Sequence, residues 1–194
     1  IRGNAGCFGG ETKDALVSVT SFDTEKLAER TRTASECHFG YRTSIFKEAQ
    51  GNEIVLSAIF LLQRGDPKEI SRAIQEKIEY RKARHPLEHP NIGSIFKNVP
   101  KERIPERFLA FVAPVIKQDP FSVVPAAFLI AEAGLKGVRM GDAMVSPKHP
   151  NFIVNMGNAK AIDVLRVIAM VKERVAEKFS VMLEEEVQHV PQAR

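Results

Sequence analysis

The hexapeptide Gly93-Ser94-Ile95-Phe96-Lys97-Asn98 combines side chains that could act on an anionic substrate. Its glycine leaves open backbone beside a serine hydroxyl, two apolar residues can anchor the segment, and a cation and an amide follow. A hydroxyl in such a site can give a proton to a developing carbanion. We therefore interpret Ser94 as a candidate general acid, and Lys97 with Asn98 as a candidate diphosphate-binding pair.

Two further candidates stand in other turns of the chain. Arg42 follows Tyr41 in the turn Phe39-Gly40-Tyr41-Arg42, and an arginine guanidinium can bind a carboxylate or phosphate through two parallel hydrogen bonds. His149 lies with Lys148 in a proline-framed turn and could touch an anion. No second histidine or cysteine stands at metal-ligand spacing, so the sequence predicts no metal site.

Each of these side chains also has an ordinary structural interpretation. A serine after a glycine is commonly a turn residue, and an isolated arginine is commonly solvated at the surface. Lys97 and Asn98 could equally be a solvated pair at the end of a strand. The chemical interpretation therefore depends on several candidates lying in one cleft.

Three consecutive glutamates, Glu184 to Glu186, stand between Leu183 and Val187. Such a run is usually a solvated face. The flanking residues have strand periodicity, however, and if Leu183 faces inward, Glu186 points to the opposite face and could line a cleft. As an acid there, Glu186 would need a pKa raised by burial or by its neighbours.

The bulk properties are those of a globular protein. The 194 residues are 44% hydrophobic and 27% charged, enough for one large domain or two small ones. A net charge of +4 fits phosphate or carboxylate ligands and is too small to indicate nucleic acid. The two cysteines form no disulfide framework and favour a reducing, cytoplasmic compartment. No apolar run approaches the ~20 residues of a membrane span, and nothing indicates an obligate protein partner.

The first half of the chain is predicted to be rich in strands. A glycine-rich opening, with Gly3, Gly6, Gly9 and Gly10, either lets backbone amides approach a ligand or is a plain surface loop. Strands are expected over residues 15–22 and 53–62, with a short polar strand between them. Because the chain starts at Ile1 within this glycine-rich run, we interpret it as a fragment lacking its N-terminal part.

The second half is predicted to be α+β, with a domain boundary between residues 65 and 66. Asp66 and Glu69 can cap a helix over 67–83, on which Ile70, Ile74 and Ile78 repeat at helical spacing. Further elements are predicted as helices over 105–113 and 126–133, strands over 138–145 and 152–154, a long final helix capped by Asn158, and a closing strand over 181–187.

Taken together, these motifs resemble the UDP-N-acetylenolpyruvoylglucosamine reductase family, the UDP-N-acetylmuramate dehydrogenases. The resemblance runs from residue 1 to about residue 187. The motifs, in order, are Gly3-Asn4-Ala5-Gly6-Cys7-Phe8-Gly9-Gly10-Glu11, the turn at 39–44, the hexapeptide, Leu129-Ile130-Ala131-Glu132-Ala133-Gly134-Leu135-Lys136-Gly137, and residues 145–155. The resemblance implies that residues 1–65 are the second half of a vanillyl-alcohol-oxidase-type FAD-binding domain. It implies that residues 66–194 are an α+β domain that binds a UDP-sugar.

The resemblance also implies a flavoprotein oxidoreductase of peptidoglycan synthesis, and so a part in cell wall biogenesis, cell shape and cell division. NADPH would reduce FAD, and hydride would then pass to UDP-N-acetylglucosamine enolpyruvate to give UDP-N-acetylmuramate. By resemblance, the catalytic residues are Arg42, Ser94 and Glu186. The same resemblance assigns FAD contacts to Gly3, Asn4, Ala5 and Gly6, and substrate contacts to Tyr41, Lys97, Asn98 and His149.

The sequence departs from the family pattern at several positions. Val99 intervenes before Pro100, Asp142 replaces a usual second glycine, and the closing motif, usually Glu-Pro-Glu-Val-Arg, is Glu184-Glu185-Glu186-Val187-Gln188. When the closing motif is aligned on Val187, Glu186 rather than Glu184 matches the family's glutamate. The family's N-terminal flavin-phosphate loops would precede Ile1, so the chain alone is expected to bind FAD weakly and to be inactive.

Two other functions stay open from the sequence alone. One is a non-catalytic nucleotide-binding or interaction module that uses the same basic surface. The other is a different flavin oxidoreductase on the same scaffold. A shared cleft for Arg42, Ser94 and Glu186 would favour the reductase over the non-catalytic module.

Overall fold

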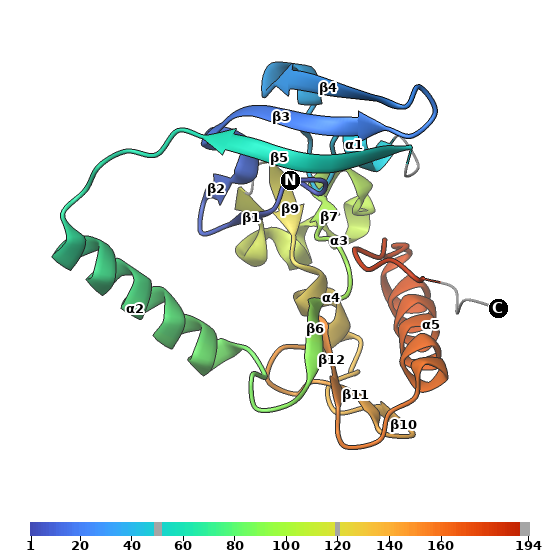
Figure 1. Cartoon of the computed structure of the whole chain (residues 1–194). Coiled ribbons are helices and arrows are strands. Elements are labelled where there is room, and N and C mark those ends of the chain that lie inside the picture. The colour runs from blue at the N-terminus through green and yellow to red at the C-terminus, as the bar shows by residue number, and fades with distance from the viewer. Residues whose placement is uncertain (49–51, 119–120, 191–194) are drawn as a thin grey trace. The chain divides into compact units, whose positions relative to one another are not determined.

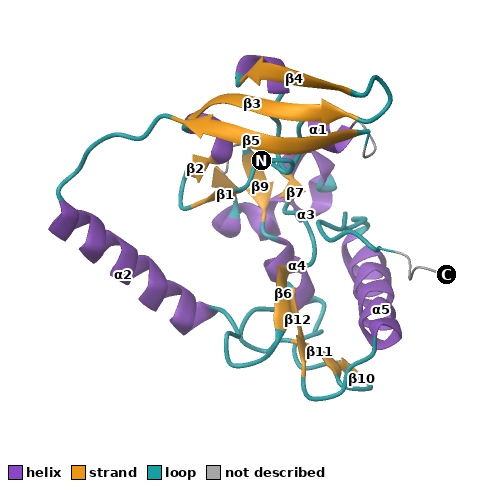
Figure 2. Ribbon diagram, in the orientation of Figure 1, coloured by secondary structure: helices purple, strands orange, loops and turns teal. Residues whose placement is uncertain are grey.

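A computed structural model describes residues 1–48, 52–118 and 121–190 of the chain (Figure 1). The chain divides into two compact units, residues 1–67 and residues 68–194. Helices and strands are mixed along its length (Figure 2), and the strands of the described sheets pair in antiparallel fashion. The fold is therefore α+β, as the sequence predicts.

The first unit is built on a three-stranded sheet in the order β4-β3-β5. Its strands are β3 (Leu16–Asp23), β4 (Ala28–Thr33) and β5 (Glu53–Phe60). Both expected strands and the short polar strand between them are thus present. A small apolar cluster of Leu16, Val19, Cys37 and Phe46 is buried in this unit. Around the sheet lie β1 (Gly6–Cys7), β2 (Gly10–Glu11), short 3-10 turns at Thr12–Asp14 and Ser35–Cys37, and α1 (Ile45–Glu48).

A buried polar network joins the three strands of this sheet. Arg32 of β4 donates two hydrogen bonds to the Glu53 carboxylate of β5, at 2.6 and 2.7 Å. The Ser21 hydroxyl of β3 donates to the same carboxylate at 2.8 Å. Hydrogen bonding from Arg32 is the main reason that the pKa of Glu53 lies below its ordinary value. The network binds one side chain from each strand and so helps to set their register.

The helix α2 (Pro67–Arg84) follows as predicted, but its apolar stripe is not in a core. Ile70, Ile74 and Ile78 are 47%, 53% and 40% exposed, and none of the 18 residues of α2 is buried. The helical spacing correctly indicates an amphipathic helix. It does not specify which surface covers the apolar face.

The second unit contains a four-stranded sheet in the order β10-β11-β12-β6. Its strands are β10 (Arg139–Met140), β11 (Ala143–Val145), β12 (Phe152–Asn155) and β6 (Asn91–Ser94). The single strand expected over 138–145 is therefore wrong, because a turn divides it. Gly141 adopts a φ of +55° at that turn, and a Cβ there would lie 2.6 Å from the Asp163 carboxylate. Glycine suits both requirements.

The long helix α5 (Ala161–Phe179) packs against β10, β11 and α4 (Ala126–Glu132) of this unit (Figure 1). It buries Val167, Ile168, Val171, Val175 and Phe179. The sequence predicted Asn158 as the N-terminal cap of α5, and this prediction is wrong. The backbone N–H of Lys160 instead donates to Asp163 at 3.0 Å, and the N–H of Asn158 donates to Asp142 at 2.8 Å. Asp142, the departure from the usual glycine, thus ties the β10–β11 turn to the start of α5.

A second, smaller sheet of this unit has the order β7-β9-β8. Its elements are β7 (Val99–Pro100), β8 (Lys117–Gln118) and β9 (Ser122–Val124), with 3-10 turns at Lys101–Arg103 and Ala113–Val115 and with α3 (Glu106–Val112) between them. Val99, the residue that departs from the family pattern, is 3% exposed and pairs with Val124. It therefore has a structural role in the core.

The closing strand expected over 181–187 is not a regular strand. Val181 and Leu183 are buried, as the alternation predicts, but the segment makes a single isolated bridge, between Glu185 and Phe96. Among the helices that the structure describes, none is long and apolar enough to cross a membrane.

Candidate active site

In the first unit, the glycine-rich loop and the Tyr41–Arg42 turn lie together. The Asn4 amide donates to the Gly40 carbonyl at 3.1 Å, and the Ser44 hydroxyl donates to the Arg2 carbonyl at 2.7 Å. The Arg42 guanidinium donates to the Gly6 carbonyl at 3.4 Å. Residues predicted to line FAD thus lie beside the arginine predicted to bind the substrate carboxylate.

Two residues of this cluster have unusual backbone conformations. Asn4 and Arg42 adopt φ values of 43° and 56°, in the left-handed region where non-glycine residues are uncommon. Lys47 donates to the Arg42 carbonyl at 2.8 Å, and the guanidinium carbon of Arg42 lies 5.1 Å from the centre of the Tyr41 ring. Surrounding contacts therefore hold Arg42 in a conformation that costs about 1–3 kcal/mol, which is typical of functional positions.

The Asn4 side chain supports the loop from within. It is fully buried, and its Oδ1 accepts a hydrogen bond from the Lys13 N–H at 3.1 Å while its amide nitrogen is bonded to Gly40. Asn4 therefore supports the loop, with its side chain bonded to Lys13 and Gly40.

The loop has the form expected along a flat ligand such as a flavin. A Cβ at Gly6 would lie 3.1 Å from both Glu11 Cγ and the Gly10 carbonyl, so packing requires glycine there. At Gly3 nothing lies within 4 Å of the corresponding position, so the backbone is open to an approaching group. These residues fit one side of a flavin site.

In the second unit, Ser94 is the last residue of β6 and pairs in register with Phe152 of β12. Gly93, just before it, adopts a φ of +87° and donates its N–H to Asn91 at 3.0 Å. The left-handed glycine turns the chain immediately ahead of the serine. Ser94 is half-buried, at the edge of the sheet.

The segment after Ser94 lies between two partners. On one side, the Lys97 N–H donates to the Glu184 carbonyl at 2.9 Å and the Glu186 N–H donates to the Ile95 carbonyl at 2.8 Å. This pairing, centred on the bridge from Phe96 to Glu185, places Glu186 opposite Ile95 and Val187 opposite Ser94 in the register. Two candidates that stand 92 positions apart in the sequence, Ser94 and Glu186, thus lie on neighbouring segments of the same unit.

On the other side, Asn151 takes the place of a neighbouring strand. Its Oδ1 accepts the Phe96 N–H at 3.0 Å and its Nδ2 donates to the Phe96 carbonyl at 2.8 Å. Its own carbonyl accepts the Ile95 N–H at 2.9 Å. Sequence reasoning did not single out Asn151, because an asparagine after a proline is commonly a turn residue.

Each of the three glutamates has its own surroundings. Glu184 pairs with Lys97 at 3.2 Å and with Arg103, and hydrogen bonding from Arg103 is the main cause of a lowered pKa at Glu184. Glu185 pairs with Lys172 of α5 at 2.9 Å and with His189 at 2.8 Å. Glu186 is half-buried.

Both members of the predicted diphosphate-binding pair have partners within the protein. The Lys97 ammonium is paired with Glu184. The side-chain oxygen of Asn98, Oδ1, accepts the N–H of Ala126 at 3.2 Å, at the start of α4. Contact with an anionic ligand would require Lys97 to exchange Glu184 for that ligand. The Asn98 side chain thus serves, through its oxygen, to hold the first residue of α4.

His149 lies in an aromatic cluster with His85 and Phe152. Its ring centre is 5.2 Å from that of His85 and 4.7 Å from that of Phe152, both edge-on. Burial, with the charge of His85 as a second cause, lowers the pKa of His149 to about 4, so the imidazole is neutral at pH 7. Its Nδ1 is buried, and no partner for it is found among the described residues.

The candidates thus form two groups. Gly3 to Gly6 lie with Tyr41 and Arg42 in the first unit, whereas Ser94, Lys97, Asn98, His149 and Glu186 belong to the second. The meeting of Arg42 with Ser94 and Glu186 stays a prediction. Within residues 1–48, 52–118 and 121–190, no group of three or more histidines, cysteines, aspartates or glutamates could hold a metal ion.

Comparison with known proteins identifies the family. The family model for the C-terminal domain of UDP-N-acetylenolpyruvoylglucosamine reductase matches residues 85–190. The reductase of Fervidobacterium nodosum is 40% identical over 185 residues, which cover 95% of this chain and 52% of that protein. The reductase of Carboxydothermus hydrogenoformans is 43% identical over 183 residues, or 94% of this chain and 52% of that protein.

A solved structure gives the same result. The crystal structure of UDP-N-acetylenolpyruvylglucosamine reductase from Thermus caldophilus matches with a TM-score of 0.70 and 34% identity, covering 98% of this chain and 58% of that one. The chain spans about half the length of the curated relatives it matches. Because the family model covers more than half of its residues, the chain belongs to the UDP-N-acetylenolpyruvoylglucosamine reductase family.

Proposed function

We propose that the full-length protein is an NADPH-dependent flavoenzyme that reduces UDP-N-acetylglucosamine enolpyruvate to UDP-N-acetylmuramate in peptidoglycan synthesis. The family assignment supports this reaction, because the relatives and the solved structure carry the name of that reductase. The single observation that carries the assignment of residues is the pairing of 95–97 with 184–186. It supports the assignment, because the backbone of Glu186 lies opposite Ile95, one residue from Ser94 and two from Lys97.

The first unit would supply one side of the flavin site and the group that binds the substrate carboxylate. When bound, FAD supplies the hydride, which it receives from NADPH. The backbone of residues 3–6 would hold the flavin. The supporting observation is that no atom lies within 4 Å of the Cβ position at Gly3. Arg42, fixed beside Gly6, would bind the substrate carboxylate, where negative charge develops when hydride adds to the enolpyruvyl double bond.

The second unit would supply the proton. Ser94 would give its hydroxyl proton to the carbon next to the carboxylate, which completes the lactyl ether. Glu186 would orient the serine or support it electrostatically from the adjoining segment. Tyr41, Lys97, Asn98 and His149 would contact the UDP-sugar, Lys97 by exchanging its pair with Glu184 for the diphosphate.

The test separates the two half-reactions in the full-length gene product. Ser94→Ala should leave flavin reduction by NADPH unchanged and should slow flavin reoxidation by the enolpyruvyl sugar by about 10²–10⁴-fold, the usual contribution of a general acid. Ser122→Ala, a serine of β9 outside the hexapeptide, is the control and should leave both rates unchanged.

Three outcomes would count against the proposal. If Ser94→Ala leaves reoxidation unchanged, Ser94 is not the proton donor. If the wild-type protein oxidises NADPH without any dependence on the enolpyruvyl sugar, it is another flavin oxidoreductase. If it binds the sugar and no flavin, a non-catalytic module is the better description.

A further inference from the structure

The consecutive residues Glu184, Glu185 and Glu186 have identical side chains, yet the proposed function uses only Glu186. Successive side chains of an extended segment point to opposite faces, so Glu184 and Glu186 share one face and Glu185 takes the other. Any shift of this segment along residues 95–97 would bring a different residue to the position of Glu186. The function therefore requires something that fixes the register.

The apolar residues prevent a shift by one position. Val181 and Leu183 are each 2% exposed and belong to the core of the second unit. A shift by one residue would turn both of them to the opposite face and bring inward either Met182 with Glu184 or Ser180 with Met182, which is unfavourable. A shift by two residues keeps the alternation, however, and the apolar residues oppose it less.

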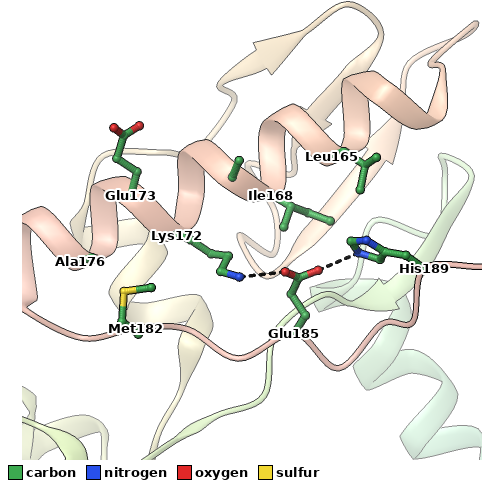
Figure 3. Close-up of a pocket in the computed structure, with 9 residues that line it drawn as sticks. Leu165, Ile168, Lys172, Glu173, Ala176, Met182, Glu185 and His189 are labelled. Carbon is green, nitrogen blue, oxygen red and sulfur yellow. Dashed lines mark hydrogen bonds and ion pairs between the residues drawn. The ribbon is translucent and has the colours of Figure 1, made fainter.

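The ion pairs of Glu185 oppose that second kind of shift. Lys172 of α5 donates to Glu185 Oε1 at 2.9 Å, and His189 Nε2 lies 2.8 Å from Glu185 Oε2, so both oxygens are held from two directions (Figure 3). A shift by two would place Leu183 or Val187 opposite the Lys172 ammonium instead. We call Lys172, Glu185 and His189 the clip.

The surroundings of the clip strengthen it. It lies in a pocket beside α5 with apolar walls that include Leu165, Ile168 and Met182 (Figure 3). Side chains of Lys172 and Glu185 are 33% and 20% exposed, so solvent screens the pair only in part. Burial acts to raise the pKa of Glu185, but pairing with Lys172 and His189 outweighs burial and lowers it, so the carboxylate is charged at pH 7.

We propose that Lys172 is a positioning residue for the reaction: by holding Glu185 against α5, it fixes the register in which Glu186 lies opposite Ile95, one residue from Ser94. The inference rests on the proposed role of Glu186. Lys172 would not touch the substrate. It would act through the backbone of 184–186, whose hydrogen bond from Glu186 to Ile95 measures 2.8 Å.

The first test measures the stability of the hydrogen bond from the Glu186 N–H to the Ile95 carbonyl in the 194-residue chain. Amide hydrogen exchange of Glu186 should become about fivefold faster in Lys172→Met, the effect of losing a partly exposed ion pair. Lys172→Arg, which keeps the charge, should restore the wild-type rate. Arg174→Met is the matched control, because Arg174 lies on the same helix and pairs with Glu177 at 3.3 Å, away from the clip.

The second test measures the two half-reactions in the full-length gene product. Lys172→Met should slow flavin reoxidation by the enolpyruvyl sugar about fivefold and leave flavin reduction by NADPH unchanged, with rescue by Lys172→Arg. A purely structural loss would weaken both half-reactions and would not be rescued by charge alone. Glu186→Gln is the reference for the full effect.

The outcomes separate this inference from the proposed function. Unchanged Glu186 exchange in Lys172→Met would overturn the inference. So would normal reoxidation in Lys172→Met when Glu186→Gln is slow. Normal reoxidation in Glu186→Gln would remove Glu186 from the proposed mechanism, and the inference would fall with it.

Discussion

Asn151 offers the most direct test of how the candidate site is held together. It is 4% exposed, and both polar atoms of its side chain bond to the backbone of Phe96, which is itself 2% exposed. Backbone groups of an extended segment point alternately to its two edges. The Ile95 carbonyl and the Lys97 N–H meet the 184–186 segment, whereas the N–H of Ile95 and both backbone groups of Phe96 meet Asn151.

The change to test is Asn151→Ala, and its cost can be worked from these contacts. The substitution leaves the N–H and the carbonyl of Phe96 buried without partners, at about 1–3 kcal/mol each. Partial relaxation and entry of water bring the expected loss in the free energy of unfolding to ~3 kcal/mol. With a urea dependence of about 1–3 kcal/mol per molar, the midpoint of unfolding should fall by about 1–3 M.

The assay is urea unfolding followed by circular dichroism. Gln118→Ala is the control, since it removes an exposed amide with one hydrogen bond, to Ser122 at 2.7 Å, and should change the free energy of unfolding by less than ~0.5 kcal/mol. Asn151→Asp should cost at least as much as Asn151→Ala, because a carboxylate oxygen would face the Phe96 carbonyl and a charge would be buried. If Asn151→Ala costs no more than Gln118→Ala, the reasoning is refuted.

Two further predictions concern pH. The pKa of Glu53 is lowered from 4.5, mainly by hydrogen bonding from Arg32. The charged Glu53 carboxylate therefore stabilises the fold fully above pH 4.5, and this stabilisation is lost as the pH falls below 4.5. In Glu53→Gln, the loss of thermal stability on acidification should be smaller. The pKa of His149 is lowered from 6.5 to about 4 by burial, so the unfolded chain binds the proton first and stability should fall from pH 6.5 toward pH 4. Titration of the His149 ring by NMR should give the same low pKa, and a value near 6.5 would contradict the burial argument.

The elements of the fold that periodicity marks strongly could be predicted from the sequence. The strands at 16–23 and 53–60 and the helix at 67–84 lie within two residues of their expected bounds. The turn at Gly141 was missed although Gly141-Asp142 is a turn signal, and the structure shows two reasons for glycine there, a φ of +55° and the approach of Asp163. The exposure of α2 could not be predicted either, since an amphipathic pattern specifies a face and not its partner.

The candidate site was predictable in residue type but not in contacts. The sequence indicates Asn4 and Asn98 as polar groups near ligands, yet Asn4 Oδ1 and Asn98 Oδ1 bond to backbone N–H groups of Lys13 and Ala126. Likewise, Lys97 is a cation in the expected segment, but Glu184 already neutralises it. A single sequence gives no measure of whether a polar side chain faces a ligand or completes the backbone of a loop, because both need the same donors and acceptors.

The run from Glu184 to Glu186 shows this limit most clearly. From the sequence alone, strand alternation assigns Glu185 to one face and its two neighbours to the other. It cannot distinguish Glu184 from Glu186. They differ only in what lies opposite. Lys97 and Arg103 bind Glu184, and the clip holds Glu185 on the other face. The cations of the hexapeptide, of residues 101–103 and of α5 thus give Glu184 and Glu185 different environments, and the register places Glu186 opposite Ile95.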